Sequence, residues 1–137
     1  MLKEIALMSA SANGSYTITQ QNNILLIDAQ GAFNEGISEQ FHQDIKAIAD
    51  KMSNAPWASL VSFKENSLFT SEAEQKLIET TQYRVDNGMI AIAAVINSTY
   101  ADVLQMQLQR VYQSCYVQFN FFSDAKHAKN WLDSLIK

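Results

Sequence analysis

The chain has 137 residues, of which 47% are hydrophobic and 18% are charged, and its formal net charge is −4. This length and composition are typical of one globular domain, expected over residues 1–137, and they argue against a disordered protein. The 14 acidic and 10 basic residues are spread along the chain, so no cationic run is present to follow a phosphate backbone. We therefore expect no nucleic-acid partner.

Five segments have the apolar patterns of strands. They are predicted at residues 15–21, 24–31, 58–63, 89–96 and 116–122. The first two flank Asn22 and Asn23, which suit a tight turn because asparagine tolerates left-handed backbone. These two strands therefore predict a hairpin. The last strand alternates apolar and polar residues and is expected at a sheet edge.

Four further segments have helical spacing of apolar residues. They are predicted at residues 34–53, about 70–86, 99–113, and from Ser123 or Asp124 to the end of the chain. Asn34 is a candidate N-cap, Gly88 is placed to end the second helix in left-handed conformation, and Tyr100 is assigned to the apolar stripe of the third helix. The order predicts an α/β fold with a five-stranded mixed sheet, in which an N-terminal β-hairpin precedes alternating βα units with about four flanking helices.

Residues that carry chemistry are sparse. No glycine-rich phosphate-binding motif is present, and His42 and His127 are too far apart in sequence to suggest a metal site. Both histidines are expected to face solvent, and Cys115 is expected to be a buried thiol. Asp28 follows a buried run and could lie at the carboxyl end of a strand, where open α/β sheets bind ligands, or could bond the next loop. We expect no catalytic residue, no metal and no cofactor, and hence no enzyme.

The composition also bears on location. A single cysteine permits no intrachain disulfide, which favours a reducing, cytoplasmic setting. The apolar run near the N-terminus is too short for a signal peptide. No run of about 18 apolar residues occurs, so we expect no transmembrane segment.

Residues 62–76, "SFKENSLFTSEAEQK", leave a predicted strand and enter the second helix with three hydroxyls, at Ser67, Thr70 and Ser71. Two interpretations are open. A helix N-terminus attracts anions, so these hydroxyls could form a phosphorylation switch or an anion or partner site. Alternatively, Thr70 or Ser71 is simply the N-cap. Ser71 is favoured as the cap because Glu74 follows it in the S-x-x-E spacing of a capping box.

The third helix offers a second candidate surface. Gln105, Gln109 and Tyr112 fall along roughly one face of it, and Arg110 lies beside them. Such side chains are either solvated or part of a docking surface. We treat Gln105, Gln109 and Arg110 as a candidate interaction surface.

The chain resembles the STAS superfamily, and within it the SpoIIAA-like (STAS/Sec14-like) small bacterial proteins, over almost its whole length. The stretches that carry the resemblance are "MLKEI", "GSYTI", "GAFNEGISEQFHQDIKAIAD", "PWASLVSF", "TSEAEQKL", "VDNGMIAIAAVI", "QMQLQRVY" and "FFSDAKHAKNWL". In the regulatory antagonists of this superfamily, a serine at the N-terminus of the second helix is phosphorylated in an Asp-Ser-Ser-Gly-like stretch. The matching positions here are Thr70 and Ser71, without that motif's acid and glycine.

The resemblance implies a non-enzymatic, regulatory module that binds an unknown protein partner through the surface around its second and third helices. Similarity to Sec14-type domains implies an alternative, a carrier or sensor of a small apolar or lipid-like ligand. Aromatic residues in the last strand and helix, together with Met89 and Met106, could line such a pocket. A homodimer also remains open.

Overall fold

The computed structural model describes residues 6–10 and 14–136. Residues 1–5, which carry the first stretch of the family resemblance, lie outside this range. The elements in chain order are β1 (Ala6–Ala10), β2 (Gly14–Gln21), β3 (Ile24–Phe33), α1 (Glu35–Met52), β4 (Trp57–Phe69), α2 (Ser71–Asp86), β5 (Met89–Ser98), α3 (Ala101–Ser114), β6 (Gln118–Phe122) and α4 (Ala125–Leu135).

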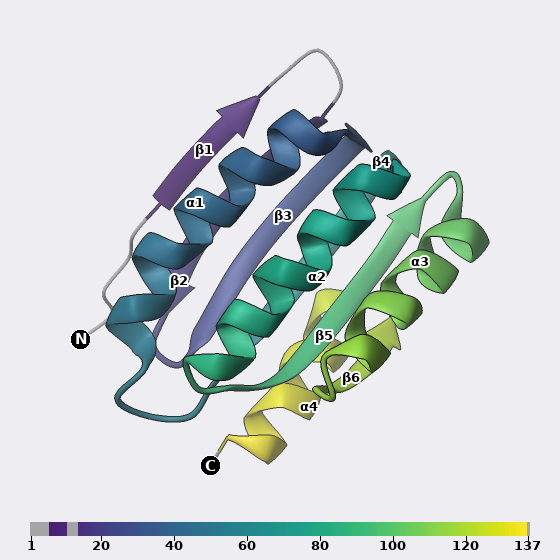
Figure 1. Ribbon diagram of the computed structural model, residues 1–137. Coiled ribbons are helices and arrows are strands. Elements are labelled where there is room, and N and C mark those ends of the chain that lie inside the picture. Colours follow the sequence, from purple (N-terminus) through teal and green to yellow (C-terminus); the bar gives the residue numbers. More distant parts are fainter. Residues whose placement is uncertain (1–5, 11–13, 137) are drawn as a thin grey trace.

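The strands form one mixed sheet in the order β1-β2-β3-β4-β5-β6 (Figure 1). Strands β1, β2 and β3 pair antiparallel, whereas β3 to β6 pair parallel and are joined by α1, α2 and α3. The α/β class, the mixed sheet, the N-terminal hairpin and the four helices are confirmed. All five predicted strands are present, and β1 adds a sixth at the edge. The sequence did not predict β1, because ALMSA does not alternate strictly between apolar and polar residues. The last strand lies at the opposite edge, as expected.

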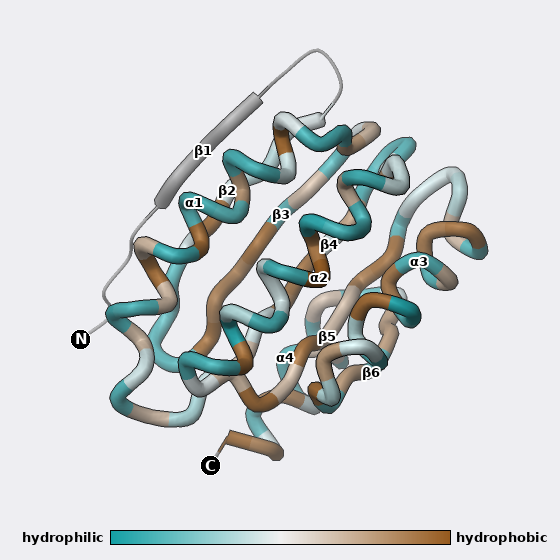
Figure 2. The backbone as a smooth tube through the Cα atoms, in the orientation of Figure 1, coloured by the Kyte–Doolittle hydropathy of each residue, from teal (hydrophilic) through white to brown (hydrophobic). Residues whose placement is uncertain are grey.

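The helices lie on both faces of the sheet. Figure 1 shows α1, α2 and α3 side by side on one face and α4 on the other. The larger hydrophobic core lies beneath α1–α3, and a smaller one lies between α4 and strands β3, β4 and β5. Figure 2 shows the matching hydropathy, with apolar residues concentrated on the central strands and polar residues on the outer turns of α1 and α2. Because the central strands are covered on both faces, they read as continuous apolar runs.

Local signals mark several boundaries where the sequence predicts them. The side chain of Asn34 accepts a hydrogen bond from the amide of Ile37 at the start of α1. Asp124 caps α4 in the same way. Asn22 has a φ of 54° in the β2–β3 turn, and Gly88 has a φ of 102° just after α2, so both left-handed residues are confirmed.

Strand β4 is much longer than predicted. The sequence placed its end at residue 63, where the apolar run stops and the polar residues Lys64, Glu65 and Asn66 follow. The strand instead continues after an irregularity, at which the β3–β4 register shifts and Glu65 adopts a φ of 60°. It then pairs with β3 again as far as Phe69. This extension carries the chain directly to the first turn of α2.

Candidate functional site

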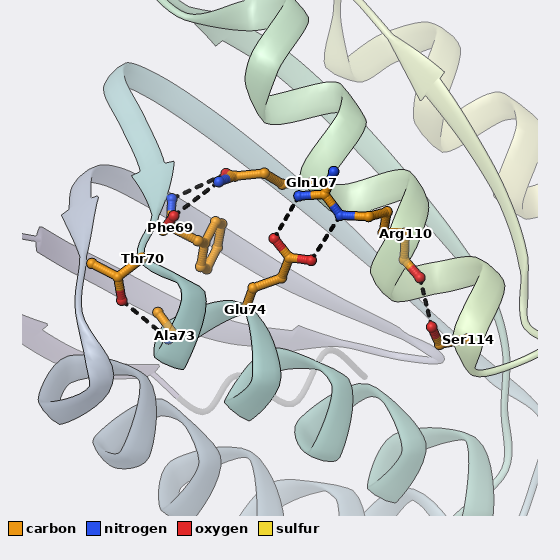
Figure 3. Close-up of polar contacts among 7 residues, drawn as sticks. All are labelled: Phe69, Thr70, Ala73, Glu74, Gln107, Arg110 and Ser114. Carbon is orange, nitrogen blue, oxygen red and sulfur yellow. Dashed lines mark hydrogen bonds and ion pairs between the residues drawn. The ribbon is translucent and has the colours of Figure 1, made fainter.

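The strand-to-helix junction at the start of α2 holds the hydroxyls singled out in the sequence, of which Figure 3 shows Thr70. Thr70, and not Ser71, is the N-cap. Its backbone is extended, with φ −68° and ψ 166°, and its hydroxyl oxygen accepts a hydrogen bond from the amide of Ala73 at 3.1 Å. Ser71 is the first helical residue, and its exposed hydroxyl makes no hydrogen bond within the described residues. The expectation that Ser71 is the cap was therefore wrong.

Glu74 does not complete a capping box. Its carboxylate turns away from the helix start and accepts two hydrogen bonds from the Arg110 guanidinium of α3, at 3.0 and 2.9 Å. These bonds raise the pKa of Arg110, which is charged in any case. The Arg110 side chain is 57% exposed, so solvent screens this bidentate pair and it contributes little to stability. Its main effect is to fix where α3 lies against the first turn of α2.

Gln107 makes the second link between α3 and the junction, and the sequence did not single it out. Its side-chain amide donates to the carbonyl oxygen of Phe69 at 2.8 Å, and its side-chain oxygen accepts from the amide of Phe69 at 3.1 Å. This pair of bonds satisfies both backbone groups of the last residue of β4 (Figure 3). Nothing in its spacing distinguishes Gln107 from the neighbouring glutamines of the helix.

Ser67 has a structural role. It is completely buried, and its hydroxyl donates to the carbonyl oxygen of Lys64 at 2.6 Å, across the irregularity in β4. Its own carbonyl accepts from the hydroxyl of Ser98 at 3.2 Å. A buried hydroxyl of this kind is not accessible to a kinase or a partner in the folded protein. The structure thus removes Ser67 from the candidate switch and leaves Thr70 and Ser71 on the surface.

The three predicted side chains of α3 diverge. Arg110 joins the junction through Glu74, whereas Gln105 and Gln109 are exposed and make no side-chain hydrogen bond within the described residues. Apolar side chains are exposed on the same helix instead. Tyr100, which the sequence assigned to the buried stripe, is 47% exposed, and Val103 and Met106 are 51% and 61% exposed. Tyr100 occupies the N-cap position of α3, outside the helical periodicity, which is why it does not follow the buried stripe.

The remaining candidates lie elsewhere. Asp28 is exposed in the middle of β3, not at a strand end, because β3 continues to Phe33. His127 is exposed and pairs with Asp124, as expected for a helical surface histidine. Cys115 is buried, and burial raises the pKa of its thiol. No group of three or more histidines, cysteines or carboxylates that could hold a metal occurs among the residues described.

His42 departs from the expectation of a solvent-facing residue. It is partly buried between α1 and α2, and its Nδ1 lies 2.8 Å from the hydroxyl oxygen of Thr80. That hydroxyl donates its proton to the carbonyl of Lys76, so it accepts from a protonated Nδ1. Burial lowers the pKa of His42 below its usual value. The ring is therefore part of the α1–α2 contact.

The electrostatics of the junction bear on anion binding. The N-terminus of α2 carries partial positive charge, but Glu72 and Glu74 already lie in its first turn. A phosphate added at Ser71 would meet both carboxylates, and Arg110 is engaged by Glu74. The geometry accordingly fits a helix cap beside an exposed surface better than a ready-made phosphate site.

Comparison with known proteins concerns the fold. The structure is similar to the crystal structure of an anti-sigma factor antagonist from Mycobacterium paratuberculosis, with a TM-score of 0.60. The match covers 91% of this chain and 98% of the other, at 13% sequence identity. The chain has the STAS, SpoIIAA-like fold. No family model and no curated protein matches the sequence.

The STAS-like fold places the junction at the carboxyl ends of the parallel strands β4 and β5, where α2 and α3 begin. The resemblance stated from the sequence is thus supported in its architecture.

Among the residues described, no helix is long and apolar enough to span a membrane.

Proposed function

We propose that this protein is a non-enzymatic, STAS-like interaction module that binds a protein partner through one surface, here called the docking surface. The docking surface consists of Thr70, Ser71, Tyr100, Val103 and Met106, with Arg110 at its rim. The observation that carries the proposal is the exposure of three large apolar side chains in the first half of α3 and at its N-cap. Gln107 and Arg110 join the same helix to the start of α2. The likeness of the fold to an anti-sigma factor antagonist supports it.

Contacts within the protein hold the parts of the docking surface together. Gln107, which fixes the end of β4, lies one helical turn after Val103 and one residue after Met106. Upstream, the amide of Thr99 donates to the carbonyl of Glu65 at 2.7 Å, which ties the start of α3 to β4. An open depression lies over residues 99–103. An apolar centre beside a polar, hydrogen-bonding rim is the usual composition of a protein interface.

The exposed hydroxyl of Ser71 gives the docking surface a means of control. Thr70 already uses its oxygen as the helix cap, whereas Ser71 is exposed and makes no hydrogen bond within the described part of the chain. A phosphate at Ser71 would add close to two negative charges beside Glu72 and Glu74. We expect this charge to weaken a partner that recognises the surface as it stands, and to leave the fold intact.

The second expectation, a carrier for an apolar or lipid-like ligand, receives less support. The interior cavity beneath α1 and α2 measures about 30 Å³. A water molecule needs at least about 10–15 Å³ measured in this way, so the cavity has room for one or two waters and not for a lipid chain. The aromatic residues expected to line a pocket pack instead against Tyr112 and, in α4, Trp131.

The test is affinity capture from cells in which the protein, or a variant of it, is the tagged bait. Met106→Glu places a charge in the centre of the docking surface. Tyr116→Asp adds the same charge at the other end of α3, at a residue that is 96% exposed and has a φ of 54°, which aspartate tolerates. We expect a protein retained by the wild type and by Tyr116→Asp, but not by Met106→Glu.

Two results would overturn the proposal. One is that every protein retained by the wild type is retained equally by Met106→Glu. The other is that the wild type retains nothing and also sediments as a monomer at all concentrations. Self-association that Met106→Glu abolishes would instead identify a second copy of the chain as the partner.

The proposal places the protein in the cytoplasm, where Cys115 would stay reduced.

A further inference from the structure

Arg84 of α2 is a buried cation that has no counter-ion among the described residues. Its side chain is only 2% exposed. Its two terminal nitrogens donate to neutral hydroxyls, Nη1 to Ser59 at 3.0 Å and Nη2 to Thr81 at 3.3 Å. Its Nε is buried and has no hydrogen-bond partner. Every other buried side-chain nitrogen or oxygen among the residues described has a partner. No carboxylate bonds or pairs with it in the described part of the chain.

An arrangement of this kind is costly. A charge taken out of water loses several kcal/mol of hydration, which is normally recovered from an opposite charge and a full set of hydrogen bonds. The ring of Phe41, 6.0 Å from the guanidinium, recovers part of it. Burial lowers the pKa of Arg84 to about 10, so the side chain stays charged at neutral pH. The side chain thus keeps one positive charge and one unused donor inside the protein.

The same side chain lines the cavity beneath α1 and α2. The cavity measures about 30 Å³ and is bounded by the sheet and by residues of α1, α2 and α3. Four lining residues carry hydroxyls, namely Tyr16, Ser38, Thr80 and Tyr112, and most of the others are apolar. The Thr80 hydroxyl already donates to the carbonyl of Lys76, and the Tyr16 hydroxyl donates to Asp44. The lining includes Ile27, Phe41, Val61, Phe63 and Leu77. None of the lining residues carries a negative charge.

We propose that this cavity binds one small, weakly hydrated monovalent anion of chloride or bromide size, held by Arg84. The anion should carry a single negative charge, because Arg84 supplies one positive charge and a second negative charge would be left unpaired in the apolar cavity. The anion should also be small, because the volume of the cavity in the observed conformation is too small for a phosphate ester or a fatty acid. The anion would accept the free Nε–H and replace hydration that the guanidinium has lost. The site lies in the interior, apart from the docking surface, and the inference goes beyond the proposed function.

Bromide is the probe, because it scatters anomalously and has the required charge and size. The first experiment is crystallisation of the wild-type protein with sodium bromide and an anomalous difference map. We expect a bromide peak inside the cavity next to Arg84. Density without anomalous signal at this position would mean that a water molecule satisfies the Nε–H, and it would overturn the proposal.

The second experiment measures unfolding by urea in sodium bromide and in sodium fluoride at equal ionic strength. At a bromide concentration ten times the dissociation constant, binding lowers the unfolding equilibrium constant of the wild type about tenfold. Arg84→Met should lose this anion-specific gain. Lys126→Met, which removes an exposed cation from α4 on the other face of the sheet, should retain it.

An equal response in Arg84→Met and the wild type would refute the assignment to Arg84. If Arg84→Met does not fold, the anomalous map of the wild type decides the question alone.

Discussion

The assignment of Thr70 as the cap of α2 is tested by replacing each of the two neighbouring hydroxyls. In Thr70→Ala, the amide of Ala73 loses its acceptor, the Thr70 hydroxyl at 3.1 Å. Loss of a helix N-cap costs about 0.5–2 kcal/mol. Ala73 is completely buried, so water cannot readily take over its amide, and we expect about 1.5 kcal/mol, in the upper part of that range.

Ser71→Ala should behave differently. Ser71 is the first helical residue and its hydroxyl makes no hydrogen bond within the described residues, so the change removes nothing from the folded state. Alanine is also the better helix former. We expect the free energy of unfolding to change by less than about 0.5 kcal/mol. Thr70→Ser, which keeps the accepting oxygen, serves as the matched control and should also stay near the wild type.

Equilibrium unfolding in urea measures all three variants. With a slope of about 2 kcal/mol per molar urea, Thr70→Ala should lower the midpoint by about 0.7 M. The midpoints of Ser71→Ala and Thr70→Ser should be shifted by about a third of that or less. The reasoning fails if Ser71→Ala costs 1 kcal/mol or more while Thr70→Ala is neutral, because the cap would then be Ser71 as the capping-box spacing suggested.

Three further changes have defined outcomes. Gln107→Ala removes both hydrogen bonds to the backbone of Phe69 and should cost about 1–2 kcal/mol in urea unfolding. The pKa of His42 is lowered in the folded protein, so as pH falls the imidazole of the unfolded chain takes up a proton before that of the folded protein. The free energy of unfolding should therefore decrease as pH drops below about 6.5. His42→Gln should make this decrease less steep. Arg84→Met in fluoride buffer removes an unpaired buried charge and should be neutral, or stabilising by up to about 2 kcal/mol.

Each of these outcomes has its own control. Gln105→Ala, an exposed change on the same helix, should stay within about 0.5 kcal/mol, and an equal loss in both glutamine variants would count against the Phe69 contact. The His42 prediction is tested by urea unfolding between pH 7.5 and 5.5. If the free energy of unfolding of His42→Gln depends on pH as steeply as that of the wild type, other groups cause the pH dependence. A loss above 2 kcal/mol in Arg84→Met would show that the bonds to Ser59 and Thr81 outweigh the cost of burying the charge.

Local signals made much of the fold predictable. Continuous apolar runs marked β3 and β5, and helical spacing marked the four helices to within a few residues. Asn34 and Gly88 act within a few residues of chain, so their roles could be inferred without knowing the tertiary structure. The same reasoning failed at β4, because the exposed residues 64–66 look like a loop when the pairing of β3 with Phe69 is not known.

The candidate site was less accessible to prediction. Thr70 and Ser71 each satisfy the local preferences of an N-cap, and only the backbone conformation at the end of β4 selects Thr70. Gln107 and Gln105 are alike in sequence, and contact with β4 makes one of them structural. Arg84 looks like an ordinary charged residue of an exposed helix face, and its burial follows from the packing of α2 between α1, α3 and the sheet.

By itself, the sequence determined the class of fold, the order of the elements from β2 onward and most of their boundaries, because these depend on periodicity, capping and turn residues within short stretches of chain. The tertiary structure alone decided which hydroxyl caps α2, which α3 side chains hold the junction, and which cation is buried without a counter-ion among the described residues. These properties depend on contacts between residues more than 20 positions apart, such as Glu74 with Arg110 and Arg84 with Ser59. Local patterns carry no information about such pairs, since the side chains meet only after the sheet and helices have packed.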